Sequence, residues 1–382
     1  MSIDETARET RIDSAGASET HSRQETVREA RIDYLPRDPV ELSRPIGLIG
    51  AGNISGMHLA AYRDAGYNVV CICDNSIDRA RGRRDEFFPS ANITDDVDDL
   101  LARPDVQVVD IATHVDVRPA LIERAIRAHK HVLSQKPFVK DLGVGARLIN
   151  TARRAGVRLA VNQNGRWAPH FAIMLAAARD GRIGTVTSAD FAVYWPHDKI
   201  VADMPAFANM RDLVLYDFGI HWFDLISRLF ADRGQAHSVY AAVNSRPGQV
   251  IPVPTEAQII ITWENATATL VLRAASHRLE SGSYRVEGTD GVVVHTGLSL
   301  GGNDVRIVTD DSDLVIPLQG DWWQNGMHGT MAELLSAIEE GREPSNDARH
   351  SLPGLALCFA AMESSRRGVP VDPRTVVVPP ED

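Results

Sequence analysis

Three side chains of different chemical types could together move a proton to or from a hydroxyl group. They are Lys136 and the pair Asp217 and His221, which are four residues apart and share one face if their segment is helical. An ammonium can stabilise developing alkoxide charge, and an imidazole can act as a general base near neutral pH. We therefore predict that Lys136, Asp217 and His221 are catalytic. The ordinary alternatives are a surface lysine and a core histidine that the aspartate satisfies.

A glycine-rich segment predicts a dinucleotide site. Gly50 and Gly52 follow a short apolar run and precede a helical stretch, while Ser55 replaces the third glycine of the usual pattern. The first glycine allows a tight turn, and the second lets the backbone approach a pyrophosphate at a helix N-terminus. We expect cofactor contacts from four residues of this turn: Gly50, Gly52, Asn53 and Ile54.

An acidic residue at the end of the next strand indicates which dinucleotide binds. Asp74, followed by Asn75, lies about 20 residues beyond the glycines, where a carboxylate accepts the ribose hydroxyls. Because that carboxylate repels a 2′-phosphate, we predict NAD as the cofactor rather than NADP. Asp74 could instead cap the following helix. Arg79 is near enough to weaken the preference, although we expect its side chain to face solvent.

Several phrases of the chain resemble one family. Ala128 to Leu133 leads into Ser134-Gln135-Lys136-Pro137, the next strand ends in Val161 to Trp167, and Asp217-Phe218-Gly219-Ile220-His221 is followed by Asp224. In this order, and with the glycine-rich turn, they resemble the glucose–fructose oxidoreductase, inositol dehydrogenase and rhizopine catabolism (Gfo/Idh/MocA) family of NAD(P)-dependent oxidoreductases. The resemblance covers about residues 45–373 and implies the catalytic roles given above for residues 136, 217 and 221.

The resemblance implies an enzyme that transfers a hydride between a nicotinamide and a secondary hydroxyl of a sugar, cyclic polyol or sugar acid. Two alternatives stay open: an NAD-dependent glycosidase with transient redox chemistry, and a non-catalytic regulator that binds sugar or dinucleotide. Retention of Lys136, Asp217 and His221 weighs against the regulator.

Two positions depart from the family pattern. Gln135 stands where the family usually has glutamate, which removes a charge that would favour protonated Lys136. His114 follows Thr113 where the family more often has proline, so it could touch nicotinamide or ribose, or be a loop residue. The further cofactor contacts that we expect at this end of the sheet are Thr113, His114, Gln135, Lys136 and Asn164.

The expected substrate side combines polar and aromatic residues. Asn164, Arg166 and Trp167 fall at the expected domain boundary, and Trp195 and His197 end a strand of the second domain. Tryptophans can stack on the apolar faces of sugar rings, although packing is an equal alternative for Trp195. The predicted substrate contacts are Lys136, Asn164, Arg166, Trp167, Trp195, His197, Asp217 and His221.

An α/β fold of two domains is expected to position these residues. From Pro45 to Asn162, short apolar runs alternate with helical stretches, which predicts a parallel, Rossmann-type sheet. The second half has helices over 169–180 and 213–229, then seven strands without intervening helices, then helices over 329–341 and 347–368. This order predicts an α+β domain with a large, mainly antiparallel, open-faced sheet. We predict a mobile tail over 1–43 that docks locally around Tyr34-Leu35-Pro36, a dinucleotide domain over 44–166, and a substrate and oligomerisation domain over 167–382.

Composition excludes several classes of protein. The chain has 382 residues and a formal net charge of −11, which argues against a nucleic-acid partner. Its three cysteines do not form a disulfide framework, so we expect a reducing, cytoplasmic location. No apolar run approaches the roughly 20 residues of a membrane span, and no metal site stands out. We expect a homodimer or homotetramer that pairs through the C-terminal sheet, as in relatives.

Overall fold

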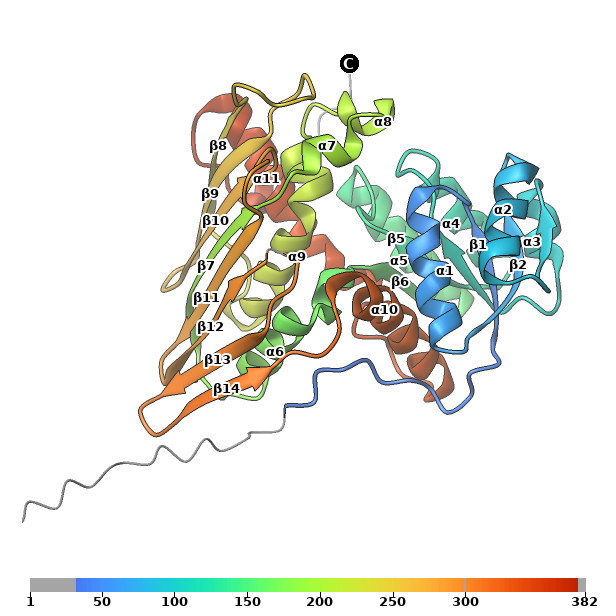
Figure 1. The fold of residues 1–382 in the computed structure, drawn as a ribbon, viewed down its shortest axis with the longest axis horizontal. Helices are drawn as coiled ribbons and strands as arrows, with labels where there is room; N and C mark the ends of the chain where they lie inside the picture. Colours follow the sequence, from blue (N-terminus) through green and yellow to red (C-terminus); the bar gives the residue numbers. More distant parts are fainter. Residues whose placement is uncertain (1–31, 299, 377–382) are drawn as a thin grey trace, which may run out of the picture.

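The computed structural model describes residues 32–298 and 300–376, and its first domain is a doubly wound parallel sheet (Figure 1). The strand order is β3-β2-β1-β4-β5-β6, and every pairing is parallel. Because helices cover both faces, strands such as β4 and β6 are buried along their whole length. The strands are β1 (Pro45–Ile49), β2 (Asn68–Cys73), β3 (Asn92–Thr94), β4 (Val108–Ile111), β5 (His131–Gln135) and β6 (Leu159–Asn162). The helices between them are α1 (Asn53–Asp64), α2 (Ile77–Phe87), α3 (Val97–Ala102), α4 (Arg118–Arg127) and α5 (Leu142–Ala155).

The second domain is built on an eight-stranded sheet, with strand order β14-β13-β12-β11-β7-β10-β9-β8. Only the pairing of β7 with β10 is parallel, so the prediction of a mainly antiparallel sheet is confirmed. Buried and exposed residues alternate along strands such as β9, which is typical of a sheet with one covered face. The strands are β7 (Val186–Tyr194), β8 (Ser238–Asn244), β9 (Glu256–Thr262), β10 (Thr267–Arg273), β11 (Ser281–Gly288), β12 (Gly291–Gly297), β13 (Asp304–Thr309) and β14 (Asp313–Pro317).

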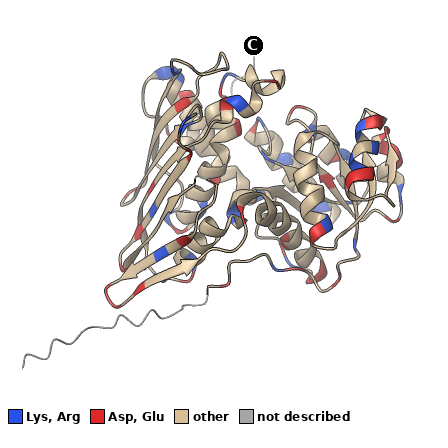
Figure 2. Ribbon diagram, viewed as in Figure 1, with Lys and Arg blue, Asp and Glu red and all other residues tan. Residues whose placement is uncertain are grey.

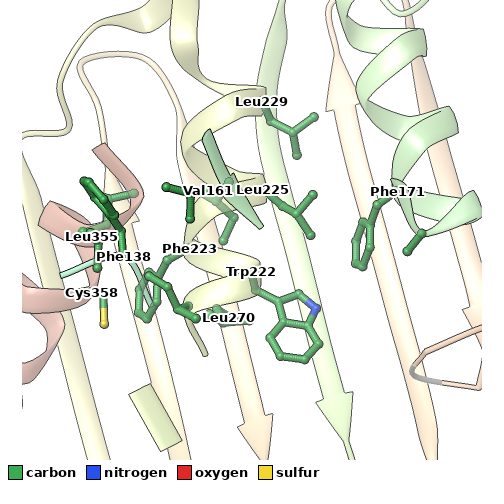
Figure 3. Packing of buried hydrophobic residues seen from close by; sticks show 14 of the residues in the cluster. Phe138, Val161, Phe171, Trp222, Phe223, Leu225, Leu229, Leu270, Leu355 and Cys358 are labelled. Carbon is green, nitrogen blue, oxygen red and sulfur yellow. The ribbon is translucent and has the colours of Figure 1, made fainter. Parts of the chain in front are cut away.

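Three helices cover one face of this sheet, and the other face is open (Figure 1). They are α6 (Pro169–Arg179), α9 (Ile220–Leu229) and α11 (Leu352–Arg367). Figure 3 shows the apolar layer between sheet and helices, where Trp222, Phe223 and Leu225 of α9 lie near Leu270 of β10. This layer fixes α9, and with it the segment that carries two of the predicted catalytic residues.

Helix α10 (Trp322–Glu339) belongs by sequence to the second half of the chain but packs on the first domain. Its buried Met327, Met331 and Leu335 share a core with Leu48 and Tyr62. The helix begins two turns earlier than the sequence predicted, because Asp321 caps it by accepting a hydrogen bond from the backbone of Gln324 at 2.8 Å. The two domains are therefore joined by a shared helix as well as by the chain connection after β6.

The described end of the predicted tail, residues 32–43, runs along both domains (Figure 1). The Tyr34 hydroxyl donates to the carbonyl of Pro317 at 3.3 Å and accepts from the backbone of Gln319 at 2.9 Å. Further along, Asp38 accepts from the hydroxyl of Tyr67 and pairs with His328. The expected docking around Tyr34 is thus present, and residues 1–31 of the predicted tail lie outside the described residues.

Charged side chains of both signs are interspersed over the two domains (Figure 2). Within residues 32–298 and 300–376, none of the helices has the length and apolarity that a membrane span requires. The same residues contain no cluster of three His, Cys, Asp or Glu side chains arranged to hold a metal ion. The described cysteines, Cys71, Cys73 and Cys358, are buried free thiols.

Candidate active site

A cavity of about 480 Å³ lies between the two domains, at the carboxyl ends of the parallel strands. This edge of an open α/β sheet is where ligands commonly bind. Twelve of the predicted site residues line the cavity: Gly52, Asn53, Ile54, Thr113, His114, Gln135, Lys136, Asn164, Trp195, His197, Asp217 and His221. Five others do not: Gly50, Asp74, Asn75, Arg166 and Trp167.

Lys136 follows β5 directly and reaches across the domain boundary to Asp217. Its ammonium Nζ donates to Asp217 Oδ1 at 3.1 Å and to the Asp217 backbone carbonyl at 2.9 Å. Burial alone would raise the pKa of Asp217, but Lys136 and His197 outweigh it and hold that pKa below its ordinary value. Asp217 is therefore an anion at neutral pH that fixes the direction of the Lys136 ammonium.

His221 lies in the same cavity, with its ring edge-on to those of Trp222 and Trp322. Its Nδ1 atom is buried and has no hydrogen-bond partner among the described residues. Burial, together with the charge of Lys136, lowers the pKa of His221 well below its ordinary value. The imidazole is thus neutral at neutral pH and can accept a proton.

The segment that carries Asp217 and His221 is not the single long helix that the sequence predicted. A π-helical turn, η2 (Val214–Phe218), comes first, and α9 starts after Gly219. A Cβ on Gly219 would lie 2.7 Å from the carbonyl of Leu215 and 2.9 Å from Leu272, so glycine is needed for this close packing. The wider turn places the Asp217 backbone carbonyl where it accepts from Lys136, and π turns of this kind are frequent at functional sites.

Arg118 supports the cavity from behind and was not predicted from the sequence. It is buried, and its guanidinium donates to four backbone carbonyls, those of Thr113, Gln135, Lys136 and Pro137. Burial lowers the pKa of Arg118 to about 10, so the group remains charged at neutral pH. It ties the end of β4 to the end of β5 and so fixes the backbone from which Lys136 projects. A buried arginine at the start of a helix has no periodic signal in the sequence.

The glycine-rich turn has the geometry that a dinucleotide requires. Gly50 has a φ of +100°, and a Cβ there would lie 3.0 Å from the backbone of Ala112, so both its conformation and its neighbours demand glycine. A Cβ on Gly52 would meet nothing within 4 Å, which leaves the backbone at the start of α1 open to a ligand. Ser55 is fully buried and donates from its hydroxyl to the Gly52 carbonyl at 2.6 Å, so it packs where the third glycine would.

The Asp74 carboxylate lies beside this turn and accepts hydrogen bonds from three residues of the protein. Asp74 Oδ2 accepts from the backbone of Ala51 at 2.7 Å, and Oδ1 accepts from Ser76 and from Arg79 Nη2 at 2.8 and 2.7 Å. As expected, the Arg79 side chain is largely exposed, at 54%, although its guanidinium also donates to Asn75 at 2.6 Å. Asp74 and Asn75 therefore form a polar group with Arg79 that lies outside the cavity lining.

Three buried polar atoms in the cavity wall fit a nicotinamide and ribose. Thr113 Oγ1, His114 Nε2 and Asn164 Oδ1 have no hydrogen-bond partner among the described residues. Leaving such atoms unpaired is costly, so a ligand that pairs with them is favoured. His114 is held by Asp116, with Nδ1 3.0 Å from Oδ2, which directs Nε2 into the cavity. Together with the open backbone at Gly52, these atoms make the site a good fit for a nicotinamide dinucleotide.

Two residues predicted to bind substrate lie elsewhere. Arg166 is buried in an ion pair with Asp224, with Nε and Nη2 2.7 and 2.6 Å from the carboxylate oxygens. Trp167 packs against Gly329 of α10, where a Cβ would lie 2.2 Å from its indole. Both line a separate cavity, most of whose lining comes from the second domain. Both residues lie in η1 (Asn164–Trp167) and are held by the second half of the chain, Arg166 by Asp224 of α9 and Trp167 by Gly329 of α10.

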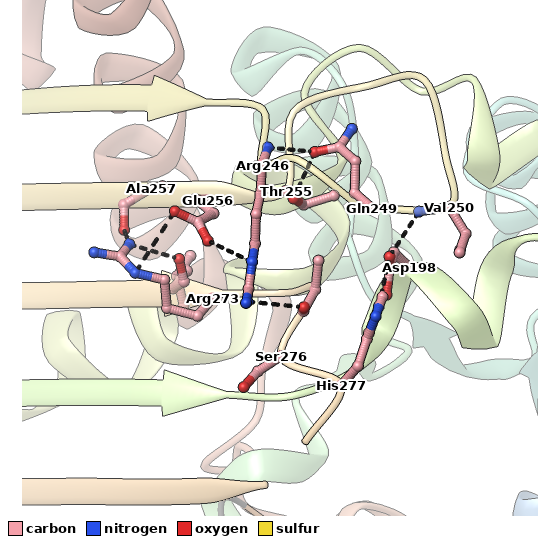
Figure 4. Close-up of polar contacts among 12 residues, drawn as sticks. Asp198, Arg246, Gln249, Val250, Thr255, Glu256, Ala257, Arg273, Ser276 and His277 are labelled. Carbon is pink, nitrogen blue, oxygen red and sulfur yellow. Dashed lines mark hydrogen bonds and ion pairs between the residues drawn. The ribbon is translucent and has the colours of Figure 1, made fainter. Parts of the chain in front are cut away.

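The remaining wall comes from two short helices that the sequence did not predict, α7 (His197–Val201) and α8 (Pro205–Ala208). His197 Nε2 lies 3.4 Å from Asp217 Oδ2, and its ring stacks on Phe218. The next residue, Asp198, is fully buried; its two oxygens lie 2.9 Å from His277 Nε2, and one accepts from the backbone of Val250 at 3.0 Å (Figure 4). This anchor fixes α7, and with it His197, beside Asp217.

Comparisons with known proteins decide the family. The description "Oxidoreductase family, NAD-binding Rossmann fold" (GFO_IDH_MocA) matches residues 44–163, and the "GFO/IDH/MocA C-terminal domain" matches residues 171–294. The chain belongs to the GFO/IDH/MocA family of oxidoreductases. The resemblance inferred from the sequence is thereby confirmed, as are the two-domain fold and the use of NAD.

Two relatives are similar over most of their length. A D-apiose dehydrogenase of Paraburkholderia graminis is 28% identical over 85% of this chain and 88% of its own. An inositol 2-dehydrogenase of Rhizobium meliloti is 26% identical over 83% and 96%. Among solved structures, an Agrobacterium radiobacter oxidoreductase in complex with NAD+, L-tartaric acid and magnesium has a TM-score of 0.77, with 23% identity over 87% of this chain and 99% of that one. At this identity, the last likeness shows the fold.

Proposed function

We propose that this GFO/IDH/MocA protein is an NAD-dependent dehydrogenase that oxidises a secondary hydroxyl of a sugar or cyclic polyol. The observation that carries the proposal is the meeting of Lys136, Asp217 and His221 in one cavity beside the open backbone at Gly52. The relatives named as D-apiose dehydrogenase and inositol 2-dehydrogenase support a sugar-like substrate.

Bound NAD would supply the acceptor for the hydride, and the residues of the chain do the rest. Lys136 donates a hydrogen bond to the reacting oxygen and stabilises its negative charge as the O–H bond weakens. His221, neutral because of its burial, takes the hydroxyl proton. Asp217 orients the ammonium of Lys136 through the contact at 3.1 Å.

The other lining residues hold cofactor and substrate in place. Gly52, Asn53 and Ile54 at the start of α1 would hold the pyrophosphate, Thr113 and His114 would hold the nicotinamide and ribose, and Gln135 and Asn164 would complete this contact set; all seven line the cavity. Trp195 and His197 face the substrate from the second domain. Asp74 is the proposed acceptor for the ribose hydroxyls and the reason for a preference for NAD over NADP.

The proposal extends to assembly and location. The open face of the eight-stranded sheet exposes Tyr240, Ile260 and Val315, each 39–49% accessible, which favours pairing of two or four copies through this face. The buried free thiols fit a cytoplasmic, reducing compartment. The mass of the protein in solution at micromolar concentration tests the assembly, and a monomer would contradict it.

The test of the activity is a panel of sugars and polyols incubated with the protein and NAD, with reduced cofactor followed by absorbance. Net reduction, lost in Lys136→Ala, is the expected result. Release of an alcohol from aryl glycosides without net reduction would favour the glycosidase instead. Tight sugar binding without turnover would favour a regulator.

A further inference from the structure

The cavity has one polar end and one apolar wall. The titratable side chains Lys136, Asp217 and His221 gather at the polar end, with His197 above them. An apolar wall comes from the segment that contains α7 and α8, where Phe207 lies edge-on to His114 and Met204 approaches Asn53. Its five contributors are Ile200, Val201, Met204, Phe207 and Met210.

The two cations that line the cavity already have partners. Lys136 donates to Asp217, and the buried Arg118 donates to four backbone carbonyls at the base of the site. Among the described residues, no other lysine or arginine lines the cavity. The backbone N–H groups at the start of α1 are taken by the proposed pyrophosphate, so a carboxylate or phosphate on the substrate would enter without a free cation to offset its desolvation.

Charged and large apolar residues of the segment that forms this wall differ in whether they line the cavity. Lys199, Asp203 and Arg211 of the same segment are exposed and are absent from the cavity lining, whereas the five large apolar residues named above line it. Asp198 anchors the segment through its pair with His277 (Figure 4), so this orientation is fixed by a buried contact.

Two apolar side chains at the cavity have no evident structural use. Ile200 is 46% exposed and Trp323, the second residue of α10, is 38% exposed. Neither belongs to the hydrophobic clusters of the described residues. Exposed apolar surface beside a binding cavity is favourable when a ligand covers it, because that surface then leaves water.

We propose that the substrate is an uncharged sugar or cyclitol ring that carries an apolar substituent, such as an O-alkyl or O-aryl group. The hydroxyl to be oxidised lies at Lys136 and His221, and the substituent lies against Ile200 and Trp323. This inference rests on the proposed dehydrogenase function and narrows its substrate class. It also removes the sugar acids from the range that the sequence left open.

The test compares derivatives of whichever ring the panel shows to be oxidised best. The free sugar, its methyl glycoside, its phenyl glycoside and its uronic acid are compared by kcat/KM from cofactor reduction. The phenyl glycoside is expected to exceed the free sugar about tenfold, the change that accompanies burial of roughly 50 Å² of apolar surface. The uronic acid is expected to fall below the free sugar. Equal values for phenyl glycoside and free sugar, or a preference for the acid, would overturn the inference.

Single substitutions test whether Ile200 and Trp323 cause the preference for the phenyl glycoside. Ile200→Ser and Trp323→Ala, both at exposed positions, are expected to reduce the ratio of kcat/KM for the phenyl glycoside to kcat/KM for the free sugar at least about threefold. Leu279→Ser is the matched control, because Leu279 is 72% exposed and does not line the cavity. A preference unchanged in both cavity variants would contradict the placement.

Calorimetry separates this inference from the function on which it rests. If no ring reduces NAD, the proposed dehydrogenase fails, and the binding of phenyl and methyl glucosides, glucose and glucuronate to the protein with NAD decides the substrate class by itself. Tighter binding of the phenyl glucoside than of glucose supports an apolar substituent. Equal binding, or tighter binding of glucuronate, refutes it.

Discussion

The ion pair between Arg166 and Asp224 tests whether the structure separates supporting residues from reacting ones correctly. The two side chains are only 6% and 1% exposed, and the guanidinium makes two short contacts to the carboxylate. Arg166→Ala would leave the carboxylate buried without its cation. Removing one partner of a buried pair costs about 3–5 kcal/mol. That is a large part of the ~5–15 kcal/mol by which a folded protein is usually stable.

The assay is urea denaturation followed by tryptophan fluorescence, with kinetics measured where each variant is folded. Arg179→Ala is the matched control, because its pair with Asp180 is 71% and 41% exposed and should contribute less than about 1 kcal/mol. The double variant Arg166→Met with Asp224→Leu removes both charges and should recover most of the lost stability. A loss below about 1 kcal/mol in Arg166→Ala would refute the reasoning. So would a rise in substrate KM of about tenfold without loss of stability, since that marks a binding residue.

Three further predictions follow from the site. Because the pKa of His221 is lowered by burial, its neutral form persists as pH falls, so kcat/KM for oxidation should stay flat down to about pH 6.5 and decline only below it; an acid limb centred above pH 6.5 would contradict this. Asp74→Ser should weaken NAD binding about tenfold or more and improve NADP binding, because Arg79 is released from the carboxylate. Fluorescence titration with both cofactors checks this, and an unchanged ratio of the NAD and NADP dissociation constants would count against Asp74 as the ribose acceptor. Asp198→Ala should lower kcat/KM about tenfold by loosening α7, with Asp198→Asn less affected because it keeps an acceptor; equal activity of both variants and the parent would show that the anchor does not position His197.

The regular elements of the fold could be predicted because their signals are local. Continuous apolar runs mark strands buried on both faces, and the glycine-rich turn is readable because the positive φ at Gly50 demands glycine and a bare backbone at Gly52 suits a close-lying ligand. The short helices α7 and α8 were missed because five and four residues carry too little periodicity. The break before α9 was missed because Gly219 sits in a helical apolar pattern, and only its packing on Leu272 reveals the need for glycine.

The site could be predicted only in part, for a related reason. Lys136, Asp217 and His221 could be singled out because the phrases that carry them resemble the family pattern and because their types suit proton transfer. Arg166 was misassigned because its partner, Asp224, lies 58 residues away and no local pattern links them. Arg118 was overlooked because its acceptors are backbone carbonyls, which leave no trace in the side-chain sequence. Tertiary pairing of charged groups is the part that the sequence does not display.

The central claim is that hydride moves directly from a carbinol carbon to NAD beside Lys136 and His221. The measurement is one turnover of a polyol substrate deuterated at the oxidised carbon, with the reduced cofactor analysed by mass spectrometry. We predict that the reduced nicotinamide carries one deuterium. Lys136→Ala is expected to form no reduced cofactor. Reduced cofactor without deuterium, or product formed with no reduced cofactor at all, would contradict it.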